Sequence, residues 1–196
     1  MSTDGEFYDV FRASGALLEG HFKLSSGLHS SGYFQCALVL QHPVHAETMG
    51  RAIASRVKDL RPTVVLSPAL GGVVIGHEVG RAVGVRAIFA ERQEGVLMLR
   101  RGFTLSGADR VVIVEDVITT GGSTRETMRV AVAAGGQVVG AGAIVDRSGG
   151  SARFEVPFRA LVQMNLPAYQ PDACPLCAEG LPLIKPGSRP GAGPPA

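Results

Sequence analysis

The 196-residue sequence has no tryptophan, only three cysteines and no apolar run long enough to cross a membrane. A membrane-spanning helix needs about 20 predominantly apolar residues. The first 15 residues also lack the basic start and apolar core of a secretory signal. A small, odd number of cysteines excludes a disulfide framework and fits a reducing compartment. We therefore expect a soluble, cytoplasmic protein.

An excess of charge of either sign is missing as well. The chain has 19 basic and 17 acidic residues, which gives a formal net charge of +2. Such a balance supplies no broad basic field to hold a phosphate backbone, so nucleic acid is not an expected ligand. The composition, 45% hydrophobic with 26 glycines, also excludes a disordered or fibrous chain. Any phosphate must be bound by local groups.

Metal-binding residues are few and scattered. Cys174 and Cys177 form a single CxxC, and the five histidines stand at positions 21, 29, 42, 45 and 77. A structural zinc site needs four ligands, and neither a second cysteine pair nor a zinc-like histidine spacing accompanies the CxxC. The sequence favours two ordinary thiols in a C-terminal turn and predicts no metal held by the protein alone. An ion shared between two chains is the alternative.

Short β-branched runs alternate with helical patterns between residues 61 and 146. Residues 62–67, 85–90, 110–115 and 137–145 are apolar on both faces, which is typical of strands in a covered parallel sheet. Residues 72–83 and 123–134 have helical spacing. The pattern predicts an α/β fold, in which helices flank a central, mostly parallel sheet.

The flanking segments predict a small addition to this core. Residues 43–60 have a helical pattern, and 158–165 would add one strand. The serine- and glycine-rich residues 20–40 predict a turn and a strand that form a hood over the sheet. We expect a single domain over residues 1–188, with the hood at about 15–42 and the core at about 43–166. Proline, glycine and serine dominate from Pro182 onwards, so residues 189–196 are expected to be a disordered tail.

The strongest chemical signal is VVIVEDVITTGGST at residues 111–124. Glu115 and Asp116 stand at the carboxyl end of a buried strand, where open α/β sheets bind ligands. The following turn opens a helix and offers backbone N–H groups, hydroxyls and the helix dipole to an anion. A phosphate cradle beside two carboxylates suits a pentose 5-phosphate with its vicinal hydroxyls. A plain helix cap by Ser123 and Glu126 is the alternative, but a cap requires neither paired acids nor two glycines.

This segment resembles the phosphoribosyl pyrophosphate (PRPP) signature of type I phosphoribosyltransferases. The resemblance implies that fold, Mg²⁺ as cofactor and a homodimer with shared active sites. It implies that Glu115 and Asp116 hold the ribose hydroxyls during catalysis. The 5-phosphate would be bound by Thr119, Thr120, Gly121, Gly122 and Ser123. Gly71 and Gly72, in the turn at residues 67–72, would face the pyrophosphate.

Residues 91–103, ERQEGVLMLRRGF, resemble the family's mobile loop, whose basic residues reach the pyrophosphate, often in the neighbouring subunit. The resemblance implies a catalytic role for Arg92 and pyrophosphate contacts for Arg100 and Arg101. Orotate-specific members usually have lysines in this loop, and this chain has none. Arginine does not replace lysine neutrally, because a guanidinium does not give up a proton. A solvated hairpin with ordinary surface arginines is the alternative.

The choice of base depends on residues 21–37, HFKLSSGLHSSGYFQCA, which resemble the hood of orotate phosphoribosyltransferases. The family commonly has a lysine where Ser25 stands, and Lys23 lies two residues earlier. Arg147 resembles the arginine that meets the orotate carboxylate, with an ion pair to Asp146 as the alternative. The residues that the resemblance places around orotate are Ser25, Ser26, Gly27, Tyr33, Phe34, Thr119 and Arg147.

The resemblance implies transfer of phosphoribosyl from PRPP to N1 of orotate, giving orotidine 5-phosphate and pyrophosphate in pyrimidine (UMP) biosynthesis. No covalent intermediate is expected, since the protein mainly positions reactants and neutralises the leaving group. A purine phosphoribosyltransferase would keep the same signature and is the nearest alternative. A non-catalytic PRPP-sensing regulator is another, although it predicts a basic module that the sequence does not show.

Overall fold

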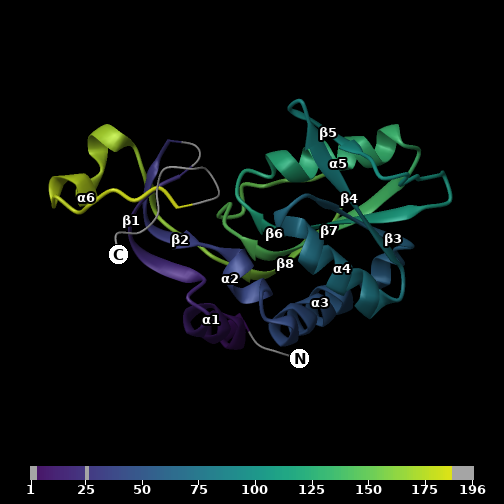
Figure 1. Cartoon of the computed structure of the whole chain (residues 1–196), viewed down its shortest axis with the longest axis horizontal. Helices are drawn as coiled ribbons and strands as arrows, with labels where there is room; N and C mark the ends of the chain where they lie inside the picture. Colours follow the sequence, from purple (N-terminus) through teal and green to yellow (C-terminus); the bar gives the residue numbers. More distant parts are fainter. Residues whose placement is uncertain (1–3, 25–26, 187–196) are drawn as a thin grey trace.

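The computed structural model describes residues 4–24 and 27–186. Its core is a six-stranded sheet in the order β5-β4-β3-β6-β7-β8 (Figure 1). Neighbouring strands are parallel except β4 and β5, which are antiparallel. The predicted mostly parallel sheet is therefore confirmed. The strands are β3 (Val64–Pro68), β4 (Arg86–Gln93), β5 (Val96–Leu99), β6 (Arg110–Ile118), β7 (Gln137–Asp146) and β8 (Phe158–Gln163).

Helices cover both faces of this sheet. Helices α3 (Pro43–Val57) and α4 (Gly71–Val83) pack on one face, and α5 (Gly122–Ala133) packs on the other (Figure 1). A 3₁₀ turn, η1 (Lys58–Leu60), follows α3. The central strand β6 is buried on both faces from Val111 to Val114, which explains its continuous β-branched sequence. Its carboxyl end, where the chemistry was predicted, lies beside the first residues of α4 and α5.

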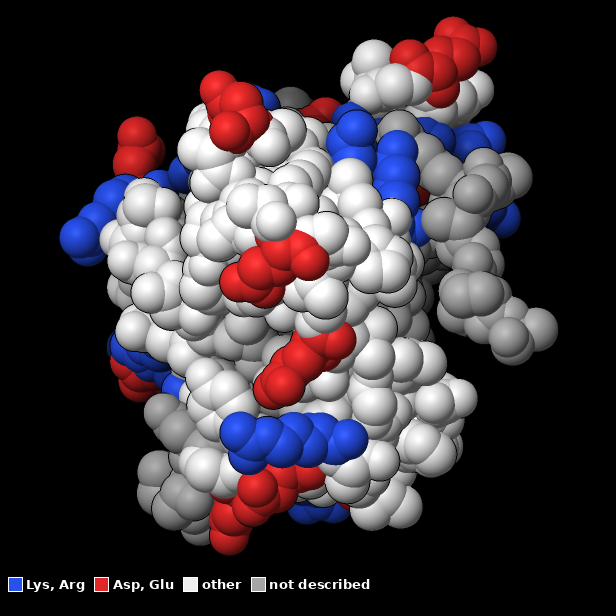
Figure 2. Space-filling model, turned by 90° about the vertical axis from the view of Figure 1, so that its left-hand side faces the viewer, with Lys and Arg blue, Asp and Glu red and all other residues white. Residues whose placement is uncertain are grey.

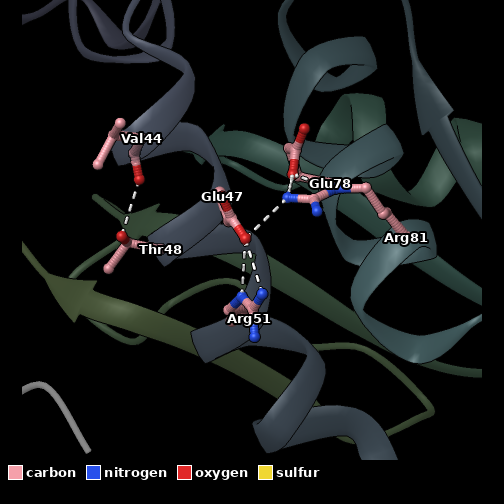
Figure 3. Close-up of polar contacts among 6 residues, drawn as sticks. All are labelled: Val44, Glu47, Thr48, Arg51, Glu78 and Arg81. Atoms are coloured by element: carbon pink, nitrogen blue, oxygen red, sulfur yellow. Dashed lines mark hydrogen bonds and ion pairs between the residues drawn. The ribbon is translucent and has the colours of Figure 1, made fainter.

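Helices α3 and α4 approach closely at Gly50. A Cβ atom added at Gly50 would lie 2.6 Å from Cβ of Glu78. Charged side chains surround this contact: Glu47 pairs with Arg51 at 2.7 Å and with Arg81 at 3.2 Å, and Arg81 pairs with Glu78 at 2.6 Å (Figure 3). These groups are partly solvent-exposed, so each pair contributes little to stability. The missing side chain at Gly50 is what permits the close packing.

Replacing Gly50 with alanine is expected to lower the free energy of unfolding by a net of about 1–2 kcal/mol, because overpacking that forces the two helices apart costs up to about 3 kcal/mol. This loss opposes the gain of about 1 kcal/mol that alanine has over glycine within a helix. Urea denaturation measures the change. Gly107→Ala is the matched control, since a Cβ there meets nothing within 4 Å. A Gly50→Ala protein as stable as the parent would contradict the packing described.

The hood is built from both ends of the chain. Strands β1 (Leu17–Lys23), β2 (His29–Phe34) and β9 (Ala168–Tyr169) form a three-stranded antiparallel sheet. Residues 4–42 contribute the larger part, so the hood predicted at about 15–42 is completed by a C-terminal segment that sequence reasoning did not assign to it. The adjoining helices are α1 (Asp4–Ala13), α2 (Cys36–Leu40), the 3₁₀ turn η2 (Pro171–Ala173) and α6 (Pro175–Ala178).

The C-terminal segment also runs along β1, since the backbone N–H of Lys23 donates to the carbonyl of Ile184 at 2.8 Å. It lies beside the hood at one end of the molecule (Figure 1). The tail predicted at residues 189–196 and the orotate contacts predicted for Ser25 and Ser26 lie outside the described residues.

On the face that presents the hood, charged side chains of both signs are scattered over a mostly uncharged surface, and some acidic and basic groups lie next to each other (Figure 2). This distribution agrees with the small net charge of the sequence. Within residues 4–24 and 27–186, no helix is both long enough and apolar enough to cross a bilayer.

Candidate active site

A cavity of about 730 Å³ lies where the hood meets the carboxyl edge of the sheet. Its wall combines residues from β2, α2, the turn before α4, the end of β6 and the residue after β7. The predicted site residues that line it are Tyr33, Phe34, Gly71, Asp116, Thr119, Thr120 and Arg147. The fold therefore gathers into one cavity residues that are more than a hundred positions apart in sequence.

The two acids lie side by side at the end of β6 but have different environments. Asp116 lines the cavity, and Gly71 packs so closely on it that an added Cβ would lie 2.6 Å from Asp116 Oδ2. Glu115 instead accepts a hydrogen bond from the Thr124 hydroxyl in α5, with Ser123 as a second donor. Asp116 is thus open to a ligand, whereas Glu115 also holds the first turn of α5 in place.

Burial raises the pKa of both carboxyl groups. For Glu115, hydrogen bonds from Thr124 and Ser123 partly offset the effect of burial, and the nearby Asp116 adds to it. For Asp116, the backbone N–H groups of Val117 and of Asp116 itself provide a partial offset. Perturbed pKa values of this kind cluster at functional sites. A ligand that brings hydroxyl donors or a cation would favour the charged forms.

The turn after β6 is arranged as an anion-binding helix start. Helix α5 begins at Gly122, and Gly121 before it has a φ of 73°, which glycine adopts without strain. No side chain caps this helix, and Glu126 pairs with Arg92 instead. The capping box between Ser123 and Glu126, which the sequence allowed, is therefore not formed. The Gly122 N–H makes a long hydrogen bond of 3.4 Å to the Thr120 hydroxyl, and the N–H groups that follow it in the first turn can face a phosphate.

The second predicted phosphate turn joins β3 to α4. The peptide bond between Ala69 and Leu70 is cis, and α4 starts directly afterwards at Gly71. Gly71 lines the cavity, whereas Gly72 packs against the carbonyl of Val114, from which an added Cβ would be 3.0 Å away. Gly72 therefore allows α4 to approach β6, and Gly71 is the member of the pair that faces the ligand space.

Arg147 lies in the cavity wall with part of its guanidinium unsatisfied. Its Nε is buried and has no hydrogen-bond partner, and no carboxylate of the described residues forms an ion pair with it. Asp146 was the alternative partner that the sequence offered for Arg147. Its side chain instead accepts a hydrogen bond from the backbone N–H of Ser148 at 2.8 Å. Burial lowers the pKa of Arg147 and raises that of Tyr33. A partly buried cation without a partner is unfavourable, so this arrangement indicates an anionic ligand.

The three arginines predicted to reach the pyrophosphate lie elsewhere. Residues 91–103 were expected to form a mobile loop, but they include an antiparallel hairpin of β4 and β5. Arg92 pairs with Glu126 of α5, while Arg101 pairs with Glu91 at 2.8 Å and Arg100 approaches Glu91 at 3.7 Å. None of the three lines the cavity of its own chain. The segment has the form of a hairpin, and the contact of its arginines with the pyrophosphate of a neighbouring subunit stays a prediction.

Several cavity residues were not predicted. Lys23, at the end of β1, supplies a second cation to the wall. The sequence did not assign it as a contact, because the family's lysine corresponds to Ser25, two residues later. Leu70 and Val74 supply apolar surface, and Leu70 is 87% exposed. Their four-residue spacing at the start of a helix was the available signal, but it did not distinguish a cavity wall from a packed core. Gly27, a predicted contact, is not part of the wall.

Solved structures with this architecture define the class of protein. An orotate phosphoribosyltransferase of Mycobacterium tuberculosis in complex with Fe(III) dicitrate superimposes with a TM-score of 0.69 at 22% identity, over 82% of this chain and 96% of that one. The enzyme of Aeropyrum pernix gives a TM-score of 0.63 at 26% identity, over 79% and 92%. The fold and the turn after β6 are those of a type I phosphoribosyltransferase.

Sequence comparison then identifies the family. Orotate phosphoribosyltransferase of Chlorobium phaeobacteroides strain BS1 is 55% identical over 189 residues, which cover 96% of this chain and 97% of the relative. That of Carboxydothermus hydrogenoformans is 51% identical over 186 residues, covering 94% and 97%. The chain belongs to the orotate phosphoribosyltransferase family. No general protein-family model matches it.

Proposed function

We propose that the protein transfers the phosphoribosyl group of PRPP to N1 of orotate, giving orotidine 5-phosphate and pyrophosphate for UMP biosynthesis in the cytoplasm. The observation that carries this proposal is Arg147, a partly buried guanidinium whose buried Nε is unsatisfied, in the same cavity as Asp116 and Thr119. Orotate has the carboxylate that such a cation requires, and adenine does not. The family of the chain agrees, as does a solved M. tuberculosis relative in complex with PRPP, 24% identical with a TM-score of 0.64.

The cavity residues divide the substrates between them. The amides and hydroxyls of Thr119 to Ser123 bind the 5-phosphate, and Asp116 with Glu115 accepts hydrogen bonds from the ribose diol. Tyr33 and Phe34 flank the pyrimidine, and Arg147 binds its carboxylate. As N1 gives up its proton to solvent and bonds to C1 of the ribose, the bond from C1 to pyrophosphate breaks and its electron pair leaves with the pyrophosphate oxygen. The residues act by holding the reactants in line and by stabilising developing charge.

The donor set of the cavity fits Mg²⁺. Asp116 is its one lining carboxylate among the described residues, and Mg²⁺ takes few protein ligands when substrate oxygens supply the others. When bound, the ion would neutralise charge on the leaving pyrophosphate. Asp116 would hold the ion indirectly, through the ribose oxygens, and the backbone N–H of Gly71 would donate to the pyrophosphate that carries the ion.

The hairpin arginines fit a homodimer with shared sites. Arg92, Arg100 and Arg101 are partly exposed and are held by Glu126 and Glu91 outside the cavity of their own chain. In this proposal they reach the pyrophosphate of the neighbouring subunit. The hood and the core act as one catalytic domain, with bounds at residues 1–188, because both contribute to the wall of one cavity.

A base-competition assay tests the proposed function. Pyrophosphate release is followed with PRPP, Mg²⁺ and orotate, adenine or xanthine in turn. We expect turnover with orotate only, since the purines leave Arg147 unpaired. Turnover with a purine alone would make the protein a purine phosphoribosyltransferase. PRPP binding without turnover of any base would favour the regulator.

A further inference from the structure

Four potential metal ligands converge in the hood, away from the cavity. The ligand atoms of His21, His29, Cys174 and Cys177 all lie within 4.8 Å of one another. His21 and His29 come from β1 and β2, whereas the two cysteines flank the start of α6. None of the four lines the proposed active site. Residues about 150 positions apart are brought together here without serving the proposed reaction.

Four of the six distances among these atoms are close to those between the ligands of one tetrahedral ion, although the set as a whole extends to 4.8 Å. His21 Nε2 lies 3.0 Å from His29 Nδ1, 3.5 Å from Cys174 Sγ and 3.7 Å from Cys177 Sγ. Cys177 Sγ lies 3.3 Å from His29 Nδ1. Zinc–ligand bonds of about 2.0–2.3 Å place neighbouring tetrahedral ligands about 3.3–3.8 Å apart. Hydrogen bonds alone would join these atoms in pairs and would not require all four to surround one point.

The tautomer of His21 is set for metal binding. Its Nδ1 lies 2.9 Å from the carbonyl oxygen of Leu181, and because a carbonyl only accepts hydrogen bonds, Nδ1 carries the proton. The lone pair of Nε2 therefore points into the cluster. Histidines that bind metals are commonly oriented by such a hydrogen bond from the other ring nitrogen. A β-bulge between Glu19 and Phe22 also sets the direction of this side chain.

We propose that these four residues form a structural zinc site that fastens the C-terminal segment to the hood. A Cys₂His₂ set fills all four positions and leaves none for a substrate. His21, His29 and Cys174 are at most 5% exposed, whereas Cys177 is exposed and closes the site on its solvent side. The sequence predicted no metal site because no second cysteine pair accompanies the CxxC. The missing ligands are histidines on an antiparallel pair of strands, whose proximity depends on strand register.

Such an ion has a clear structural task. The hood sheet is small, and β9 pairs with β2 through only His29 and Ser30. Small units of this kind usually need a disulfide or a metal for stability. The zinc would join β1, β2 and α6 directly. Because Lys23, Tyr33 and Pro186 line the cavity, fixing this part of the chain would also fix one wall of the active site.

Metal analysis of the untagged protein, purified under reducing conditions without chelator, tests the inference. We expect about one zinc per chain by plasma mass spectrometry. Cys174→Ser/Cys177→Ser and His29→Ala should each lose most of it. Cys36→Ala and the exposed His42→Ala, the matched controls, should keep it. A chelator should lower the thermal midpoint of the parent protein and leave that of the double cysteine variant unchanged.

A variant that fails to fold does not decide the matter, so the parent chain provides a second measurement. After chelation and reloading with Co²⁺, it should show the intense visible bands of tetrahedral cobalt and a thiolate charge-transfer band. Absence of bound zinc after incubation with Zn²⁺ and dialysis would overturn the inference. So would half an equivalent, which means an ion shared between chains, or octahedral cobalt bands. None of these results depends on turnover.

Discussion

Replacing Arg147 with methionine is expected to lower kcat/KM for orotate roughly 10- to 150-fold, with most of the change in the KM for orotate. A hydrogen bond to a charged group contributes about 1.5–3 kcal/mol, which corresponds to that range. The contact to the carboxylate exists before and during the reaction, so its loss weakens ground-state binding as well. Steady-state kinetics with orotate varied at saturating PRPP measure the effect.

The same substitution should leave the ligand-free protein at least as stable as the parent. Methionine fills similar volume, and it removes a partly buried guanidinium whose buried Nε has no partner. Thermal denaturation without ligand tests whether the substitution that weakens orotate binding leaves the stability unchanged or higher. Arg51→Met, on a side chain that is 69% exposed on α3, is the control and should change neither property. An Arg147→Met protein with unaltered KM for orotate would place the carboxylate elsewhere.

The second large effect is expected for Asp116→Asn, which should reduce kcat/KM for PRPP roughly 10- to 150-fold. Asparagine keeps the shape of aspartate but loses the charge-assisted hydrogen bonds to the ribose diol, which are each worth about 1.5–3 kcal/mol. Asp9→Asn, on an exposed side chain of α1, is the control. Unchanged kinetics in Asp116→Asn would show that the ribose does not bind at the end of β6.

Asp116 also predicts a pH dependence of stability. Because burial raises its pKa above the ordinary value of 3.8, the folded protein keeps a proton that the unfolded chain releases. The contribution of this group to the free energy of unfolding therefore falls as the pH rises from the ordinary value through the raised one. The Asp116→Asn variant has no carboxyl group here and does not lose this stability. Without ligand, its thermal midpoint should therefore be higher than that of the parent, and the difference should grow as the pH rises through the raised pKa. A parent protein that gains stability relative to the variant over this range would contradict the account.

The core of the fold could be predicted because its strands are buried on both faces. Val111 to Val114 have a continuous β-branched sequence that suits a covered parallel strand, and the acids after them mark the functional edge of the sheet. Helix α1 was missed, although Phe7 and Phe11 have helical spacing and are both buried, because the segment is otherwise mixed. The two-residue strand β9 carries no pattern of its own and is defined only by its partner, β2.

The candidate site could be predicted where one short segment carries several groups. Asp116, Thr119 and Thr120 come from a single strand and turn, so their proximity follows from local structure. The hairpin at residues 91–103 was harder, because a loop and a two-stranded hairpin share the same glycine-containing turn. That turn includes Glu94 at a φ of 50° and Gly95 at 85°. Lys23 and Val74 belong to the wall only because the hood sits over α4.

The four proposed metal ligands show most clearly that contacts between distant segments cannot be predicted from the sequence. His21 and His29 are eight positions apart, a spacing that is not a zinc signature, and they are separated from Cys174 by most of the chain. Their convergence depends on the register of β1 with β2 and on the return of the C-terminal segment to the hood. Tertiary pairing of this sort leaves no periodic signal in the sequence.

A crystal structure of the protein soaked with orotate, PRPP and Mg²⁺ tests most directly whether the cavity between hood and sheet is the place of reaction. The account predicts the orotate carboxylate on the guanidinium of Arg147, the ribose hydroxyls on Asp116 and the 5-phosphate on the backbone of residues 119–123. An empty cavity at saturating ligand, or a sugar phosphate bound away from that turn, would contradict it.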